Sequence, residues 1–249
     1  MERALTCLRR ASAGAPAPEV FDWTITSWEV TDGEVIARGG FGEVARGKWL
    51  GHTEVAIKRL FVRLDTARLR EDFLREVRVW YPLRHPNVLP LLGACATAER
   101  PFMISPFMSR GHALQYIEKT DDRVEALRIL YQISQGMQYL HSRRIVHGDL
   151  KAVNVLIDEH GKAYVSDFGF TVLKKVSATR KTTATASLTG TLRWMAPERL
   201  MGGKLEPPVD VYAFAMTCYE ILSGGDIPMS GKLTPMKSLP AQYPFLVTL

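Results

Sequence analysis

The spacing of apolar residues predicts a first part of the chain that is mostly sheet. Short apolar runs alternate with glycine-bearing turns, as in an antiparallel meander. One longer segment, 65–81, has apolar side chains at helical spacing instead, which predicts a single helix beside the strands. The apolar face of this helix consists of Leu69, Phe73, Val77 and Trp80. The predicted strands are 35–37, 43–48, 54–60, 88–95 and 102–105.

The second part of the chain has the pattern of helices. Asp122 and Glu125 have the spacing of a capping box and predict the start of a long helix. Its predicted apolar stripe is Leu127, Leu130, Ile133, Met137 and Leu140. Segment 209–222 is apolar almost all round, which predicts a helix that is buried on every side. Short strands are predicted near Val146, at 155–157 and at 163–165.

These patterns predict an α+β fold with two lobes. The N-lobe, 21–105, is an antiparallel sheet with one helix, and the C-lobe, 106–222, is mainly helical. Residues 1–20 are rich in Ala, Pro and Arg and are predicted to be a disordered tail. Residues 223–249 carry no helix signal and are predicted to be an irregular tail.

Composition excludes few function classes, but it bears on the cellular compartment and on the kinds of partner that we expect. No run of 18 apolar residues occurs, so no membrane span is expected. The three cysteines are far apart and lack metal-site spacing, which favours a reducing compartment, the cytoplasm or the nucleus. The net charge of +6 is modest and no nucleic-acid motif accompanies it, so we expect no nucleic-acid partner.

Two N-terminal motifs suggest that the chain handles phosphate. GGFGEV at 39–44 lies between two predicted strands, where glycines let backbone N–H groups approach phosphate oxygens. Alone it is weak, because most glycine-rich hairpins are only turns. VAIK at 55–58 then places Ala56 and Lys58 on one strand face, where a lysine can reach phosphates. Glu76 is the candidate partner of Lys58; the alternatives are an exposed lysine and a surface carboxylate.

The strongest signal lies in HGDLKAVN at 147–154 and SDFG at 166–169. Phosphoryl transfer needs a carboxylate that orients the attacking hydroxyl, oxygen ligands for Mg²⁺ and a nearby cation. Asp149, Asp167, Asn154 and Lys151 carry these groups. Mg²⁺ favours such hard oxygen ligands. Single loop aspartates are common, but the ordered set is not.

Over residues 28–222 the chain resembles the eukaryotic protein kinase family, with its motifs in the expected order up to MAPE at 195–198. The resemblance implies ATP and Mg²⁺ between the lobes, with Asp149, Lys151 and Lys58 as catalytic residues and Asn154 and Asp167 as metal ligands. The implied ATP contacts are Ile36, Gly39, Gly40, Phe41, Gly42, Val44, Ala56, Lys58, Glu76, Ser105, Pro106, Met108 and Leu156. The family's stacked spine would consist of Trp80, Leu91, His147 and Phe168, anchored by Asp210.

The substrate is expected to be a protein. Lys151 and GTLRWMAPE at 190–198 resemble Ser/Thr kinases, where Thr191 would meet Asp149 and Lys151. WTITSWEV at 23–30 and RWMAPE at 193–198 look like the tyrosine-kinase-like group with its fungal members, which is mostly but not strictly Ser/Thr-specific.

Three departures from the family pattern change the expectations. Ala37 replaces the first glycine of the loop, which should weaken ATP binding modestly. Gly148 replaces an Arg that pairs with a phosphorylated activation loop, so activity should depend less on such phosphorylation. The chain also ends before the family's last helices, as in a truncated gene model or splice product. Glu198 would then be a buried carboxylate without its Arg, and the helix around Asp210 would be exposed to a covering partner.

Two alternatives to an active protein kinase follow from these departures. One is a catalytically impaired pseudokinase or nucleotide-binding scaffold fragment, which the missing helices favour and the retained Lys58, Asp149, Asn154 and Asp167 oppose. The other is an inert fragment.

Overall fold

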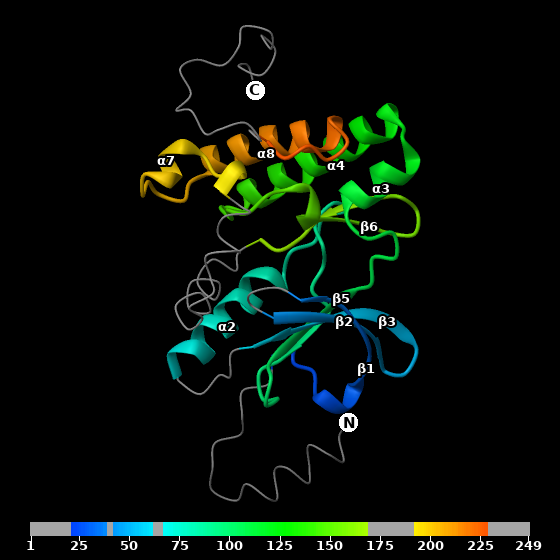
Figure 1. The fold of residues 1–249 in the computed structure, drawn as a ribbon. Coiled ribbons are helices and arrows are strands. Elements are labelled where there is room, and N and C mark those ends of the chain that lie inside the picture. Colours follow the sequence, from blue (N-terminus) through cyan, green and yellow to red (C-terminus); the bar gives the residue numbers. More distant parts are fainter. Residues whose placement is uncertain (1–20, 39–41, 62–66, 169–191, 229–249) are drawn as a thin grey trace, which may run out of the picture.

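The computed structural model describes residues 21–38, 42–61, 67–168 and 192–228, and they form two lobes, one mainly sheet and one mainly helix (Figure 1). The N-lobe sheet has the order β1-β2-β3-β5-β4, and every neighbouring pair is antiparallel. The predicted meander is therefore confirmed for the first three strands, whereas β5 lies between β3 and β4. The strands are β1 (Val30–Arg38), β2 (Gly42–Trp49), β3 (Thr53–Leu60), β4 (Gly93–Cys95) and β5 (Phe102–Pro106).

The strand predicted at 88–95 is wrong in its first half. Only Gly93–Cys95 joins the sheet, as β4. Val88 instead makes a single parallel bridge to Val165, and the Leu89 N–H donates to the Val165 carbonyl at 2.9 Å. Pro90 separates the two parts and has no N–H to donate to a ladder. Apolar residues 88–89 therefore contact the C-lobe.

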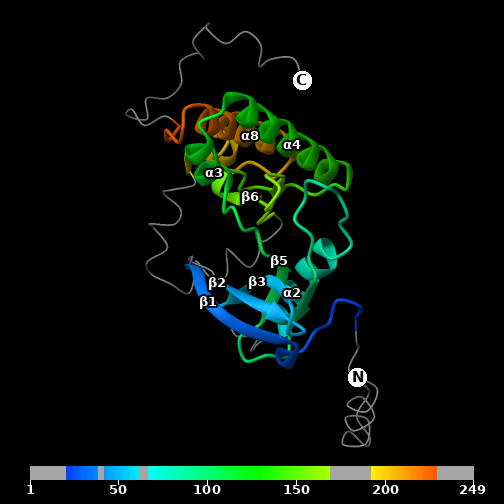
Figure 2. The ribbon, with the colours of Figure 1, turned by 90° about the vertical axis from the view of Figure 1, so that its right-hand side faces the viewer.

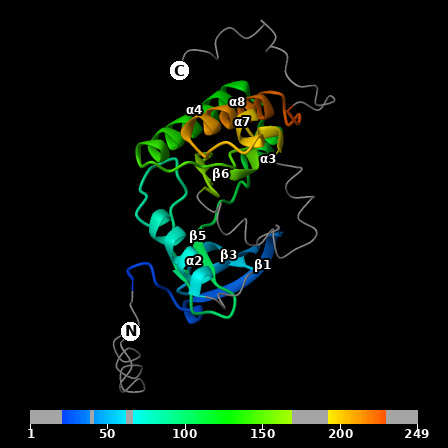
Figure 3. The same ribbon diagram turned by 90° about the vertical axis from the view of Figure 1, so that its left-hand side faces the viewer.

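The predicted helix of the N-lobe is α2 (Ala67–Trp80), which lies beside the sheet (Figure 3). Its predicted face is confirmed, because Leu69, Phe73, Val77 and Trp80 are all buried. Phe73 and Val77 share a core with Met103 of β5. The burial of this stripe is the main reason that a 14-residue helix is stable here.

The two longest helices of the described residues, α4 and α8, are in the C-lobe and lie side by side (Figures 1 and 2). Residues 145–150 form no strand, so the strand predicted near Val146 is wrong. The described elements are α3 (Ala113–Thr120), α4 (Arg123–Ser142), η2 (Ala152–Asn154), β6 (Val155–Ile157), β7 (Ala163–Val165), η3 (Leu192–Trp194), α7 (Pro197–Leu200) and α8 (Pro207–Leu222).

Helix α3 has no counterpart among the predicted elements. Its start is marked by His112 and Gln115, because His112 Nδ1 accepts from the Gln115 N–H and the Gln115 side chain accepts from the His112 N–H. This is a capping box with His in place of the usual Ser or Thr. Because the helix has only 8 residues, its apolar pattern is too short to predict it.

Helix α4 begins at the predicted place with different contacts. Asp122 is the N-cap and accepts from the Val124 N–H at 2.8 Å, but Glu125 does not complete a capping box. The Glu125 carboxylate accepts from the Tyr116 hydroxyl and from Arg128 instead. These contacts connect α3 to α4.

The predicted stripe of α4 contains one error. Leu127 is 58% exposed, whereas Leu140 is fully buried. The core side of the helix is broader than a single stripe because it also packs against β7 and α8. Its buried residues are Ala126, Ile129, Leu130, Ile133, Gly136, Met137 and Leu140.

Leu127 and Leu140 form a matched pair for a stability measurement. Leu140→Ala is expected to lower the free energy of unfolding by about 3–5 kcal/mol, because it removes buried methyl groups and leaves a cavity. Leu127→Ala should change it by less than about 0.5 kcal/mol, because the site is exposed. Urea denaturation of both variants measures the difference; equal losses would contradict the assigned face of α4.

Helix α8 is not buried on every side, contrary to its sequence pattern. One face packs through Val209, Ala213 and Ile221, but Val211 on another face is 59% exposed. Tyr219 and Leu222 are exposed as well.

Among the described residues, no helix combines the length and the apolar character that spanning a membrane requires.

Candidate functional site

Lys58 connects the two lobes. It lies in β3 opposite Val44 and Met103, on the strand face away from the buried Val55 and Ile57. Its ammonium group donates to Oδ1 of Asp167, which lies 109 positions later in the chain. Asp167 belongs to the C-lobe, where it follows β7 and Ser166. Strand periodicity thus determines the face on which Lys58 lies, and the contact with Asp167 joins that face to the C-lobe.

Glu76, the other candidate partner of Lys58, lies on the buried side of α2 between Phe73 and Val77. It is largely buried, which contradicts the alternative of a plain surface carboxylate. Buried carboxylates need a cation or hydrogen-bond donors. Its pairing with Lys58 stays a prediction.

Asp149, Lys151 and Asn154 are held together by short contacts in the loop before β6. Lys151 Nζ lies 3.4 Å from Asp149 Oδ1, and Asn154 Nδ2 donates to the Asp149 carbonyl at 2.6 Å. The Asn154 carbonyl in turn accepts from the N–H and the hydroxyl of Ser166, the residue before Asp167. The loop thus brings both predicted metal ligands and the predicted catalytic carboxylate to one place.

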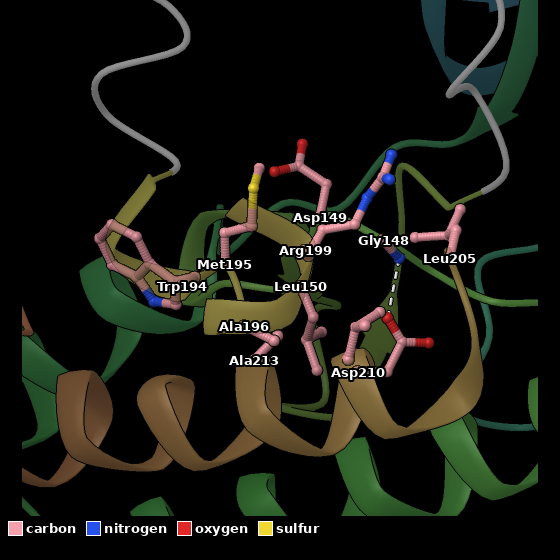
Figure 4. A pocket seen from close by; sticks show the side chains of 11 residues that line it. Gly148, Asp149, Leu150, Trp194, Met195, Ala196, Arg199, Leu205, Asp210 and Ala213 are labelled. Carbon is pink, nitrogen blue, oxygen red and sulfur yellow. Dashed lines mark hydrogen bonds between the residues drawn. The ribbon is translucent and has the colours of Figure 1, made fainter. Parts of the chain in front are cut away.

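Asp210 anchors this loop from α8. The Asp210 carboxylate accepts from the backbone N–H groups of His147 and Gly148, each at 2.8 Å, and is within 2.8 Å of His141 Nε2. Figure 4 shows the bond from Gly148. Asp210 is only 1% exposed, so these contacts replace water around a buried acid.

Gly148 is suited to this anchored loop by its lack of a side chain. Its φ is +72°, a region that glycine adopts at little cost. A Cβ would also lie 3.1 Å from Leu205.

Gly42, at the start of β2, also occupies a position where a side chain does not fit, since a Cβ would lie 2.1 Å from the Arg59 carbonyl oxygen. Ala37 lies within β1 and is not among the residues with positive φ, so its methyl group causes no such strain.

The predicted spine is present as packed aromatic rings. Phe168 is in edge contact with Trp80 of α2 at 5.7 Å and with His147 of the loop at 6.2 Å between ring centroids. Leu91 and Phe168 are both buried in the same core. The rings therefore connect α2 to the residue beside Asp167.

The predicted ATP contacts are contributed by both lobes. Ser105 lies opposite Ala56, and Pro106 lies opposite Val55, at the end of β5. Ser105 and Met108 are buried, whereas Ile36 is exposed on β1. Leu156 of β6 is half-buried and bridges to His112. Gly39, Gly40, Phe41 and Thr191 lie outside the described residues.

Comparison with known proteins decides the family. The family model described as protein tyrosine and serine/threonine kinase matches residues 30–241. The chain belongs to the protein kinase family. The match spans both lobes and includes Lys58, Asp149, Asn154 and Asp167.

Relatives of this kinase domain carry both specificities in their names. The chain is 36% identical over 221 residues to the probable serine/threonine-protein kinase drkD of Dictyostelium discoideum, covering 86% of this chain and 16% of the relative. It is 33% identical over 226 residues to the serine/threonine-protein kinase STY17 of Arabidopsis thaliana (90% and 38%). It is 31% identical over 226 residues to the human tyrosine-protein kinase FRK (87% and 44%). The chain therefore spans less than half the length of these relatives.

Glu198 is not buried in this kinase domain, so the expectation of a buried carboxylate is wrong. Its side chain is exposed at the start of α7, so it is not a buried carboxylate that needs an Arg. Its backbone carbonyl accepts from the Gly203 N–H at 2.8 Å. Four-residue α7 is held at the surface, where water can solvate the acid.

Glu220 is the buried acid that the sequence analysis missed. It lies on α8, is 5% exposed, and its Oε2 accepts from the Ala152 N–H at 2.9 Å and from Trp194 Nε1 at 3.0 Å. Burial raises the pKa of Glu220, and the two hydrogen bonds oppose that shift. An acid inside an otherwise apolar helix was the available signal, because such a residue is costly without partners.

The raised pKa gives a pH-dependent stability. Below the unfolded-state pKa of about 4.3 both states of Glu220 are protonated; as pH rises through the higher folded-state pKa, its contribution to stability is lost. The Glu220→Gln side chain cannot ionise. The free energy of unfolding of this variant minus that of the wild type should therefore increase with pH over that range and be constant above it. Urea denaturation of both proteins from about pH 4 to pH 8 tests this. A difference independent of pH would contradict a raised pKa.

Proposed function

We propose that this chain transfers the γ-phosphoryl group of MgATP to Ser or Thr hydroxyls of proteins. The observation that carries the proposal is a chain of contacts across the lobes: Lys58 of the N-lobe contacts Asp167, Ser166 beside Asp167 bonds to Asn154, and Asn154 bonds to Asp149. Membership of the kinase family supports it.

Each residue then has a role that its chemistry supports. Lys58 binds the α- and β-phosphates. Like the Asp167 carboxylate that it contacts here, these phosphates are anionic and accept hydrogen bonds from its ammonium group. Asp149 accepts a hydrogen bond from the substrate hydroxyl and orients its oxygen for in-line attack. Lys151, 3.4 Å from that carboxylate, is close enough to stabilise charge on the transferred group.

Asn154 and Asp167 fit a magnesium site. They offer an amide and a carboxylate oxygen, the hard ligands that Mg²⁺ prefers, and the Asn154 amide is oriented by its bond to the Asp149 carbonyl. When bound, Mg²⁺ supplies positive charge next to the phosphate oxygens. The chain's own contribution is to hold these two ligands beside Lys58 and Asp149.

Ser or Thr is favoured over Tyr by Lys151 and by the relatives named as serine/threonine kinases. We also propose that the chain belongs to the tyrosine-kinase-like group, on the basis of its segments WTITSWEV at 23–30 and RWMAPE at 193–198. The relative named as a tyrosine kinase makes Tyr the second candidate acceptor. Phosphoamino-acid analysis of the product distinguishes the two.

The test is phosphotransfer from MgATP to a peptide library that contains Ser, Thr and Tyr acceptors, with Lys58→Met as the control. We expect wild-type transfer, and a rise in melting temperature with MgATP that Lys58→Met reduces. ATP-induced stabilisation without transfer by the wild type would favour the pseudokinase alternative. A chain without cooperative unfolding would be an inert fragment.

We also propose that an apolar protein surface covers the exposed face of α8, defined by Val211, Tyr219 and Leu222. The relatives named above are more than twice as long as this chain, which supports a further segment of chain as that surface. In the chain of residues 1–249, replacing Val211 and Leu222 by Ser should then reduce self-association in sedimentation velocity; unchanged association would contradict the proposal.

We further propose a reducing compartment, the cytoplasm or the nucleus, which the free Cys95 and Cys218 support.

A further inference from the structure

Glu220 connects two segments that border Asp149. One segment is the loop of residues 147–154, here called the catalytic loop, which Glu220 contacts through the backbone N–H of Ala152. The other is η3, which it contacts through the indole N–H of Trp194. A single carboxylate oxygen, Oε2, accepts both bonds. The two segments are therefore fixed to the same point of α8 and so to each other.

Both segments lie next to groups of the proposed reaction. Ala152 directly follows Lys151, which contacts Asp149, and begins the turn that ends at Asn154. Trp194 and Met195 line one wall of a small pocket, and Gly148, Asp149 and Leu150 line another (Figure 4). The distance between these two walls thus depends on the residues of α8 that bond to both segments.

The chemistry of Glu220 is poorly explained by packing alone. A buried carboxylate is costly in an apolar environment, and an apolar side chain of similar size would fill the same space. Such a residue would leave two buried N–H donors without an acceptor. Replacement would therefore disturb the catalytic loop and η3 together.

Asp210, on the same helix, provides a useful contrast. Its carboxylate accepts from the backbone N–H groups of His147 and Gly148 and contacts His141, all of which lie outside η3. Asp210 thus holds the catalytic loop in place, whereas Glu220 holds that loop relative to η3.

We propose that Glu220 is a positioning residue that sets the distance between Asp149 and the η3 wall, where a protein substrate would lie. The inference rests on the proposed kinase function. It assigns Glu220 an effect on the protein substrate and on the transfer step, with little effect on ATP, because neither of its partners is among the predicted ATP contacts.

The test compares Trp194→Phe, Glu220→Ala and Glu220→Gln in steady-state kinetics with ATP and peptide varied separately. Trp194→Phe keeps an aromatic ring and removes only the N–H. Its peptide KM should rise, or its kcat fall, by roughly three- to tenfold, the equivalent of one buried hydrogen bond. Glu220→Ala should lose more, and Glu220→Gln should recover most of the loss, because its amide oxygen can accept both bonds. The KM for ATP should stay within about twofold in all three.

Trp49→Phe is the matched control, because Trp49 Nε1, at the end of β2, also donates to a carboxylate, that of Glu29 just before β1. It should change the melting temperature without changing the peptide KM. The inference is overturned if Trp194→Phe and Glu220→Ala also change only the melting temperature, or if the KM for ATP rises as much as that for the peptide. A wild-type chain that transfers no phosphate overturns the proposed function, and this inference with it; an active wild type with unaffected variants overturns this inference alone.

Discussion

Asp149→Asn is expected to lower kcat for phosphotransfer by about 10²–10⁴-fold, the range for loss of a positioned general base. The substitution keeps the size of the side chain and replaces an acceptor carboxylate by an amide. The Asn154 amide bonds to the Asp149 carbonyl, not to its side chain, so the loop should stay in place. Steady-state kinetics with a Ser/Thr peptide measures the loss.

A second measurement separates chemistry from binding in this variant. MgATP should still raise the melting temperature of Asp149→Asn, because Lys58, Asn154 and Asp167 remain. Asp121→Asn is a matched control, since Asp121 is an exposed C-cap with φ of +46°, a conformation that Asn also tolerates. Wild-type activity in Asp149→Asn would refute the role of Asp149, and loss of MgATP stabilisation would point to a disturbed site instead.

Asp210→Ala is expected to lower the free energy of unfolding by about 3–5 kcal/mol. It removes the acceptor of the His147 and Gly148 N–H groups and leaves these donors with a hydrophobic methyl group. For a domain of this size the loss corresponds to a melting temperature lower by about 6–20 °C. Differential scanning calorimetry measures it.

Asp122→Ala is the control for the loss of an aspartate that accepts a backbone N–H in an exposed position. The N-cap of α4 should contribute about 0.5–2 kcal/mol, clearly less than Asp210. Similar losses in the two variants would mean that water replaces Asp210 in the folded state. A loss of activity in Asp210→Ala without a change in melting temperature would assign it to the reaction rather than to the fold.

Residues whose role depends on local pattern were predictable. The apolar face of α2, the three hairpin strands and the β6–β7 hairpin follow from periodicity over a few residues, and the structure confirms them. The candidate site was predictable for a different reason: phosphoryl transfer needs particular groups, and the ordered motifs contain Lys58, Asp149, Asn154 and Asp167.

Other features could not be predicted because each depends on which segments meet. Leu127 and Leu140 have the same side chain on one helix, yet only contacts with β7 and α8 decide which of them is buried. Glu198 and Glu220 were reversed in the same way: the acid expected to be buried is exposed, and the one that drew no attention is buried.

The amino-acid sequence by itself determined the chemistry that this chain can offer, since a side chain's charge and hydrogen-bonding groups belong to the residue. It also determined the local elements whose apolar spacing spans several turns or strand residues. Only the tertiary structure decided that Asp167 neutralises Lys58, that Asp210 and Glu220 hold the loop around Asp149, and that one side of α8 is exposed. Burial and partner choice are properties of pairs of distant segments, and no local pattern contains them.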